Sequence, residues 1–214
     1  MKVVILGAGF GGLRLARKLN NKAGVDVVLI DRFNFHQFQP LFYQVATASL
    51  DASNISFPLR KLFQGSKNVR VRLANVEKIE TAQKKVITNI GDFEYDTLVI
   101  AMGGDTNFFG NQQLSDNAFP MKSTVEALQL RHRLMTLFEE AVNAQDEKDN
   151  NRFERLMNIV VVGGGPTGVE LSGAISEIKR YEVPKDYPEL NAAAMNIYLL
   201  EGGPKILGAM SEQS

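Results

Sequence analysis

The chain has 214 residues, enough for one large domain or two small ones, and its 24 basic side chains balance 24 acidic ones. This balance provides no net attraction for nucleic acid or for an anionic membrane surface. With no cysteine and only two histidines, the sequence excludes a disulfide framework, a redox-active dithiol, a thiolate metal site and a histidine-rich metal cluster.

The first predicted elements form a strand, a glycine turn, a helix and a second strand. Lys2–Leu6 is a short apolar run that is typical of a buried parallel strand. A helix follows, predicted from apolar residues at helical spacing: Leu13, Ala16 and Leu19. Gly24 is expected to end this helix, and Val25–Ile30 is the second predicted strand, followed by Asp31.

Residues 32–65 carry no clear periodicity, and the next predicted elements are strands. Val69–Leu73 is predicted as a third strand, and Tyr95–Ala101 as a strongly apolar one. Between them, two shorter β segments and a turn at Gly91–Asp92 indicate a small antiparallel meander; the segments are Val76–Ile79 and Lys84–Thr88.

A long helix is predicted next, because Ser123 and Glu126 have the spacing of a capping box. Its apolar positions keep helical spacing: Val125, Leu128, Leu134, Leu137, Phe138 and Ala141. The polar run Gln145–Asn151 then marks a linker and a candidate domain boundary.

A second strand–glycine–helix unit follows that run. Asn158–Val162 is the strand, and a helix is predicted from Val169 to about Arg180. Tyr181–Asn191 contains two prolines and is interpreted as an excursion before the strand Asn196–Leu200. The predicted fold class is therefore α/β, with two Rossmann-like dinucleotide-binding units.

Both units carry a G-x-G-x-x-G loop between strand and helix. The motif glycines are Gly7, Gly9 and Gly12 in the first loop, and Gly163, Gly165 and Gly168 in the second. The first glycine makes the tight turn, the second lets the backbone approach a pyrophosphate, and the third allows close packing of helix on strand. A glycine-rich turn without a ligand is the alternative for either loop alone.

An acidic residue follows the second strand of each unit. Asp31 and Glu201 are each placed to accept a hydrogen bond from a ribose 2′-hydroxyl, and the alternative for Glu201 is an ordinary charge at a strand end. No arginine follows Glu201 closely, so NAD is predicted rather than NADP. Two dinucleotide sites in one chain indicate a flavin and a nicotinamide that exchange a hydride.

Three segments resemble type II NADH:quinone oxidoreductases, within the superfamily of flavoproteins with two dinucleotide sites. Phe38–Leu50 resembles the family's F-Q-P-L-L-Y-Q-V-A-T-G-S-L stretch, which lies along the flavin ring. Val161–Gly173 resembles its NADH-site segment, and Tyr95–Gly110 a third block. The resemblance covers essentially the whole chain. It implies hydride transfer from NADH to FAD, followed by reduction of a membrane quinone.

The resemblance also implies roles for individual residues. In the FAD site it implies roles for Gly7, Gly9, Gly12 and Asp31 at the adenosine and pyrophosphate, for Val76 at the adenine, for Pro40, Gln44 and Thr47 near the isoalloxazine, and for Ala101 and Gly103 against the FAD. Glu170 would lie where nicotinamide meets flavin, as the candidate catalytic residue, and a carboxylate stabilised by the helix dipole is the equal alternative. His36 is a candidate flavin neighbour or proton donor, but a surface or packing histidine is the more frequent case, so His36 is not predicted to be catalytic.

The chain departs from the family pattern at two residues and in length. Ala48 stands where the family usually has glycine, and Met102 where it usually has threonine. Family members are about twice as long, so the chain is interpreted as a fragment: an FAD-binding domain at 1–120, a connecting helix and linker at 121–156, and a truncated NAD(H)-binding domain at 157–214. Its unpaired sheet edges favour self-association.

The expected location is the cytoplasm, or the cytoplasmic face of the inner membrane through a C-terminal part outside this sequence. Two other functions stay open. A ferredoxin- or rubredoxin-type reductase of the same superfamily needs no cysteine, whereas disulfide reductases and sulfide:quinone oxidoreductases do. Alternatively, the chain is a nucleotide-binding fragment without catalytic activity.

Overall fold

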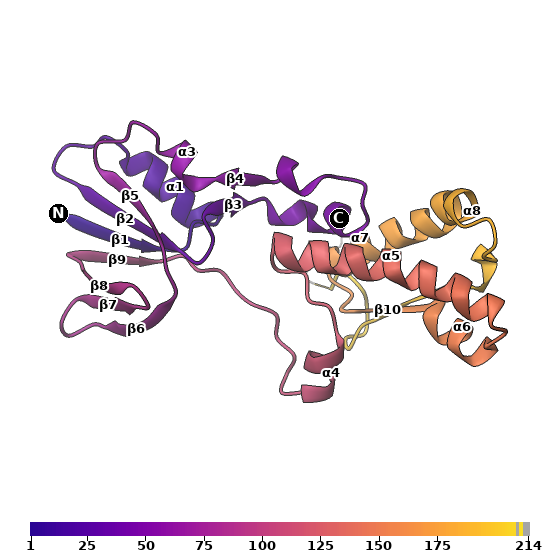
Figure 1. The fold of residues 1–214 in the computed structure, drawn as a ribbon. Helices are drawn as coiled ribbons and strands as arrows, with labels where there is room; N and C mark the ends of the chain where they lie inside the picture. Colours follow the sequence, from indigo (N-terminus) through magenta and orange to yellow (C-terminus); the bar gives the residue numbers. More distant parts are fainter. Residues whose placement is uncertain (209, 212–214) are drawn as a thin grey trace. The chain divides into compact units, whose positions relative to one another are not determined.

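The computed structural model describes residues 1–208, 210 and 211, and the chain divides into two compact units (Figure 1). The first unit comprises Met1–Phe38 and Ser53–Asn107, and the second comprises Gln39–Ala52 and Phe108–Ser214. The α/β class predicted from the sequence is confirmed, because parallel strands alternate with helices in both units.

The first unit is built on a four-stranded parallel sheet in the order β5-β2-β1-β9. Its strands are β1 (Lys2–Leu6), β2 (Asp26–Asp31), β5 (Val69–Leu73) and β9 (Thr97–Ile100). The central strands β1 and β2 consist almost entirely of valine, isoleucine and leucine, because both faces of this sheet are covered. The other elements of the unit are α1 (Phe10–Leu19), β3 (Phe35–Gln37), β4 (Ser56–Pro58), α3 (Leu59–Leu62), β6 (Val76–Glu80), β7 (Lys85–Thr88) and β8 (Gly91–Glu94), and the turn η2 (Ala52–Asn54) begins at the last residue of a second-unit segment.

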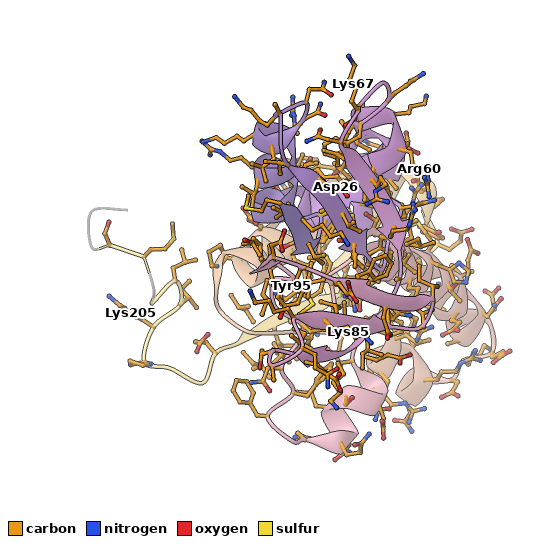
Figure 2. The ribbon with its side chains drawn as sticks, turned by 90° about the vertical axis from the view of Figure 1, so that its left-hand side faces the viewer. Asp26, Arg60, Lys67, Lys85, Tyr95 and Lys205 are labelled. Carbon is orange, nitrogen blue, oxygen red and sulfur yellow. The ribbon has the colours of Figure 1, made fainter. Side chains whose placement is uncertain are left out.

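Two separate hydrophobic layers lie on the two faces of this sheet. On one face α1 and α3 pack on the sheet, through a cluster that includes Ile5, Leu13 and Leu59. On the other face the antiparallel meander β6-β7-β8 packs on it, through a cluster that includes Leu6 and Val86. Figure 2 labels Asp26 in β2 of the sheet and Lys85 in β7 of the meander.

The structure confirms the predicted strands of the first unit and corrects two details. The predicted turn at Gly91–Asp92 is wrong: the hairpin turns at Asn89 and Ile90, and Gly91 pairs with Thr88 as the first residue of β8. The first helix ends at Leu19 rather than at Gly24, because the chain already leaves helical geometry at Asn20.

The second unit contains a two-stranded parallel sheet, β10 (Asn158–Val162) and β11 (Asn196–Leu200). Its helices are α2 (Phe42–Ala46), α4 (Gln112–Asn117), α5 (Thr124–Asp146), α6 (Asn150–Leu156), α7 (Pro166–Glu177) and α8 (Val183–Asp186), with short turns η1 (Gln39–Leu41), η3 (Ile178–Glu182) and η4 (Ala192–Ala194). One core cluster, which includes Phe138, Val161 and Ile175, joins α5, β10 and α7.

The segment 39–52 belongs to the second unit although unit-one residues flank it in the sequence. Its helix α2 contacts both α5 and α7. Three of the five α2 residues are buried: Phe42, Val45 and Ala46. Hydrophobic burial therefore attaches this segment to helices that lie far along the chain.

The helix α5 begins where the capping box predicts. Ser123 is the N-cap, and its hydroxyl accepts the Glu126 N–H at 3.2 Å, while the Glu126 carboxylate accepts the Lys122 N–H at 2.7 Å. The predicted apolar face is only partly correct, because Val125 and Leu128 are exposed. The buried residues at this end of the helix are Thr124 and Ala127.

Three further predictions concern the second half of the chain. The polar run 145–151 covers the last two residues of α5, the three-residue connection 147–149 and the first two residues of α6, all inside the second unit. The predicted excursion at 181–191 instead begins as a helical continuation: α7 passes into the π-helical turn η3 and then into α8. Across the part of the chain that the structure describes, no helix combines the length and apolar character needed to cross a membrane.

Candidate functional site

The first glycine loop is the tight connection between β1 and α1. The Gly7 N–H donates to the Ile30 carbonyl at 2.7 Å, and Gly7 has a φ of +95°. A Cβ on Gly7 would lie 2.3 Å from the Ala101 carbonyl oxygen, and a Cβ on Gly12 would lie 1.8 Å from the Gly7 oxygen. Both positions therefore exclude any side chain, as the motif requires.

Within the part of the chain that the structure describes, the N-terminus of α1 presents unpaired amides at this loop. Gly9 is the N-cap and provides no side-chain cap, and the first bond of the helix runs from Leu13 N–H to Gly9 O. The amides of Phe10, Gly11 and Gly12 therefore have no acceptor within the helix. Together with the positive end of the helix dipole, they are suited to bind a phosphate.

Two side chains hold Ala8, the second residue of the loop: Asp31, the last residue of β2, and His36 in β3. One carboxylate oxygen of Asp31 accepts the Ala8 N–H at 2.6 Å, and the other accepts the Phe33 N–H at 2.7 Å. The His36 Nδ1 lies 2.9 Å from the Ala8 carbonyl oxygen. Both backbone groups of Ala8 are thus occupied.

The second glycine loop repeats this local geometry. The Gly163 N–H donates to the Leu200 carbonyl at 2.8 Å, and Gly163 has a φ of +109°. A Cβ on Gly168 would lie 1.9 Å from the Gly163 oxygen. Gly165 is the N-cap of α7 and provides no side-chain cap. Pro166 has no N–H, so this helix presents one amide fewer than α1.

Glu201 has the place in the second loop that Asp31 has in the first. Its carboxylate accepts the N–H groups of Gly164 and Gly203, each at 2.7 Å. The Gly203 and Gly164 amides hold the pKa of the Glu201 carboxyl below its ordinary value, because they bind its charged form. On the other side of Gly164, the Leu207 N–H donates to the Gly164 carbonyl at 2.7 Å.

The structure brings together most of the first site's predicted residues. Gly7, Gly9, Gly12, Asp31 and Ala101 surround one loop, and the Ala101 N–H donates to Leu6 O at 2.7 Å. Two other residues lie on neighbouring segments: Val76 begins β6, two residues after Ala74, whose N–H donates to the Asp31 carbonyl at 2.9 Å, and Gly103 follows β9 with a φ of +72°.

The other predicted residues belong to the second unit. Pro40 lies in η1, Gln44 in α2, and Thr47 is the C-cap of α2. Gly163, Gly165, Gly168 and Glu201 surround the second loop. Glu170 is exposed, one turn into α7. The cofactor roles of these residues stay predictions.

The segment after α2 has a feature that concerns Ala48. The Thr47 hydroxyl donates to the Tyr43 carbonyl at 2.8 Å, and the next residue, Ala48, has a φ of +60°. Left-handed backbone disfavours any residue with a Cβ. The position where the resembled family usually has glycine is therefore one where glycine relieves strain.

Two contacts of the loops were not predicted from the sequence: the His36 bond to Ala8 and the Leu207 bond to Gly164. Both partners lie a few residues after the acid at the end of the strand: His36 follows Asp31, and Leu207 follows Glu201. A polar ring five residues after Asp31 was a visible signal, whereas a backbone donor such as Leu207 has no sequence signature.

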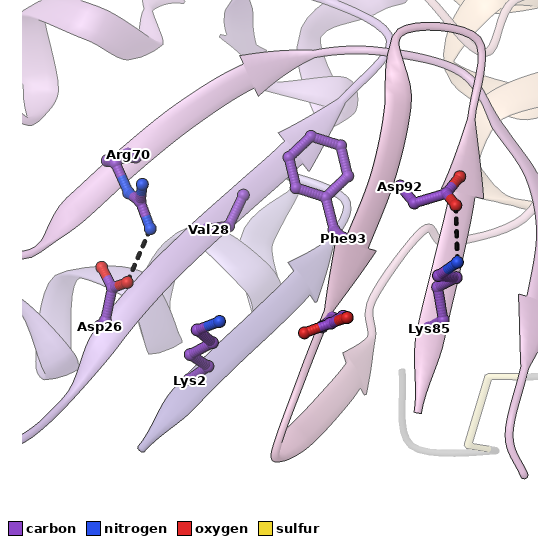
Figure 3. A pocket seen from close by; sticks show the side chains of 8 residues that line it. Lys2, Asp26, Val28, Arg70, Lys85, Asp92 and Phe93 are labelled. Atoms are coloured by element: carbon purple, nitrogen blue, oxygen red, sulfur yellow. Dashed lines mark hydrogen bonds and ion pairs between the residues drawn. The ribbon is translucent and has the colours of Figure 1, made fainter. Parts of the chain in front are cut away.

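A cavity of about 360 Å³ in the first unit lies at the opposite edge of the sheet, where β1, β2 and β5 begin (Figure 3). Its charged lining is largely self-neutralised: Arg70 pairs with Asp26 at 2.6 Å, and Lys85 with Asp92 at 2.8 Å. The hydrogen bond to Asp92 raises the pKa of the Lys85 ammonium. These pairs connect the sheet strands and the meander strands internally, and they leave little net charge for a phosphate.

Comparison with known proteins adds a family and several relatives. The family model described as pyridine nucleotide-disulphide oxidoreductase matches residues 1–214. Two type II NADH:quinone oxidoreductases of Mycobacterium tuberculosis, Ndh and NdhA, are 38% and 37% identical over 98% of this chain. The aligned part is 45% and 44% of those proteins, so the chain spans about half the length of the curated relatives it matches.

One solved structure shows the same arrangement of elements. The structure of NDH2 from Plasmodium falciparum in complex with NADH matches 99% of this chain and 44% of that chain, with a TM-score of 0.87 and 25% identity. A ferredoxin reductase from Rhodopseudomonas palustris matches 99% of this chain and 45% of that chain, with a TM-score of 0.68 and 20% identity, which shows the fold alone.

Proposed function

The chain belongs to the pyridine nucleotide-disulphide oxidoreductase family, and on this premise we propose that it is the FAD- and NADH-binding part of a type II NADH:quinone oxidoreductase. The observation that carries the proposal is the repetition of one loop geometry in both units. Each loop combines a left-handed first glycine, a third glycine pressed on it, and a strand-end carboxylate bonded to the second residue.

FAD is assigned to the first loop. The close approach of Gly12 to Gly7 leaves the unpaired amides of α1 exposed at the turn, and a diphosphate matches their charge and spacing. Asp31 would accept from a ribose hydroxyl with lone pairs that its two backbone bonds leave free. Val76, Ala101 and Gly103 would border the bound group.

NADH is assigned to the second loop. Glu201 would take the ribose hydroxyl through the lone pairs that its bonds to the Gly164 and Gly203 amides leave free. A carboxylate with no arginine after it disfavours a 2′-phosphate, so NADH is preferred over NADPH. Gly163, Gly165 and Gly168 would hold the pyrophosphate.

The segment around α2 is proposed to serve the flavin ring through Pro40, Gln44 and Thr47. Glu170 on α7 is proposed to lie near the reacting nicotinamide, where a carboxylate can tune the transfer or relay a proton. Its alternative role is to interact with the dipole at the start of α7. In this proposal residues 1–120 contribute the FAD domain, 121–156 connect, and 157–214 contribute to the NADH domain.

The proposed reaction is transfer of two electrons from NADH through FAD to a quinone. When bound, the flavin supplies the chemistry that links a hydride donor to a quinone, and the protein contributes position and electrostatics. The chain has no cysteine, so the disulfide chemistry in the family's name is not carried by these residues. Peripheral membrane attachment, the inner-membrane location and self-association of the chain belong to the proposal as well.

The test is a visible absorption spectrum of the purified protein with FAD, before and after anaerobic NADH. A flavin band that stays with the protein and bleaches on NADH supports both assignments. A retained band that does not bleach contradicts the second assignment, and the absence of a retained band contradicts the first. Subsequent reoxidation by a soluble quinone, but not by ferredoxin or rubredoxin, separates the proposal from an iron–sulfur protein reductase.

A further inference from the structure

The second residue of each glycine loop is held on both sides, but by different means. At Ala8 the N–H is held by Asp31 and the carbonyl by His36, at 2.6 and 2.9 Å. At Gly164 the N–H is held by Glu201 and the carbonyl by the Leu207 N–H, each at 2.7 Å. A side chain in the first loop therefore does what the backbone does in the second.

The carbonyl bond has a geometric consequence for the next residue. In a trans peptide the C=O and the following N–H point in opposite directions. Fixing the Ala8 carbonyl therefore fixes the direction of the Gly9 N–H. Among the contacts of the described residues, this amide has no acceptor, and it precedes the unpaired amides of α1.

The chemistry of the contact determines whether Nδ1 of the ring carries a hydrogen. A backbone carbonyl only accepts hydrogen bonds, so the His36 Nδ1 must carry the hydrogen. The ring is also fixed by Phe10, which meets it edge-on at 5.5 Å between centroids, with 75° between the planes. Its orientation therefore has two independent constraints, one polar and one aromatic.

We infer that His36 is a positioning residue for FAD binding, which aims the Gly9 amide at the diphosphate by holding the Ala8–Gly9 peptide plane through its Nδ1–H. The inference rests on the proposed assignment of FAD to the first loop. It gives His36 a function without contact with the reacting atoms.

Two substitutions separate the donor from the ring. H36F keeps an aromatic ring against Phe10 and removes the donor, whereas H36N removes the ring and keeps an amide N–H in the place of Nδ1. The dissociation constant of FAD is measured for both, together with thermal unfolding of the FAD-free protein. H36F is expected to bind FAD roughly three- to tenfold more weakly, as loss of one hydrogen bond allows, and H36N within about twofold of wild type.

The matched control is the second loop. NADH binding should be the same in all three proteins, because the Leu207 backbone holds Gly164 in each. Two results would overturn the inference in favour of a packing role. One is normal FAD binding by H36F with weak binding by H36N, and the other is equally weak FAD binding by both variants.

A second measurement stands apart from FAD. Nitrogen-15 NMR of the imidazole in the FAD-free protein should show the Nδ1–H form of His36, although a free histidine favours Nε2–H. A predominant Nε2–H form at His36 overturns the inference. If the wild-type protein shows the Nδ1–H form but does not bind FAD, the proposed function is rejected. The hydrogen bond from His36 to the Ala8 carbonyl would still be supported.

Discussion

The two glycine loops have the same local backbone but different neighbours. In the first unit β1 lies between β2 and β9, and the chain leaving β9 brings the Ala101 carbonyl against Gly7. In the second unit, within the described residues, β10 pairs with β11 on one side, and a Cβ on Gly163 would meet no atom within 4 Å. The glycine motif is therefore sufficient for the turn, whereas the neighbouring strand β9, present only in the first unit, brings backbone atoms against the first glycine.

The largest expected effect is the one that separates the loops. G7A combines backbone strain at φ +95° with a clash against Ala101, whereas G163A has the strain alone. We expect the free energy of unfolding to fall by about 4 kcal/mol for G7A and about 2 kcal/mol for G163A. Hydrogen exchange of the β1 and β10 amides measures each unit separately. Equal losses would show that the neighbouring strand is irrelevant.

The next effect should be the same in both loops. G12A and G168A each place a Cβ within 2 Å of a backbone oxygen of their own loop, at 1.8 and 1.9 Å. We expect each to cost about 3 kcal/mol by the same exchange measurement. The matched control is G173A in α7, where a Cβ would meet no atom of the described residues within 4 Å and alanine should stabilise the helix by about 0.5–1 kcal/mol. A large difference between G12A and G168A would mean that the loops are not equivalent even locally.

A smaller effect concerns the second loop's carboxylate and depends on pH. The folded-state pKa of Glu201 is lowered by the Gly203 and Gly164 amides, so its contribution is present above the ordinary value of 4.5 and is lost as the pH falls below it. The wild type should therefore exceed E201Q in thermal unfolding temperature at pH 7, and the difference should shrink below pH 4.5. A constant difference from pH 7 to pH 3 would argue against the backbone bonds as its source.

The smallest expected effect measures the cost of left-handed backbone alone, which is the cost assigned above to G163A. Ala48 is exposed and has a φ of +60°, so A48G relieves left-handed strain without loss of packing. We expect a gain of at most about 1 kcal/mol in the free energy of unfolding by urea titration. Lys84, exposed with a φ of +49°, is the parallel position, and K84G should stabilise similarly. No gain at either position would imply that the cost of G163A has another origin.

The sequence correctly predicted the helices and strands whose position depends on a single local pattern. Apolar runs ending in glycine located β1 and β10, and Ser123 with Glu126 located the start of α5. The two strand-end acids, Asp31 and Glu201, were singled out because each directly follows the predicted apolar strand after a glycine loop. Both carboxylates accept an amide of their own loop, and their ribose roles stay predictions.

Predictions failed where long-range packing competes with periodicity. Val125 and Leu128 fit the helical spacing of α5 but are exposed, since Thr124 and Ala127 are the buried residues there. The hairpin turn does not include Gly91, because this glycine pairs with Thr88 as part of a strand. Residues 39–52 gave no element from periodicity, because α2 has only five residues and its burial depends on α5 and α7.

The assignment of residues 39–52 to the second unit also affects the order in which the two units can fold during synthesis. The chain passes between the two units after Phe38, after Ala52 and after Asn107. The apolar residues Phe42 and Val45 leave the ribosome long before α5 and α7 exist to cover them. At roughly 5–20 residues per second, that wait is on the order of ten seconds.

During this interval the first unit can already close its parallel sheet, since all four strands precede Asn107. Residues 39–52 must then remain an open apolar loop on a folded unit until the second half is made. A newly made chain in which only the first unit has folded would expose Phe42 and Val45, and exposed apolar side chains are what chaperones bind and what aggregation joins.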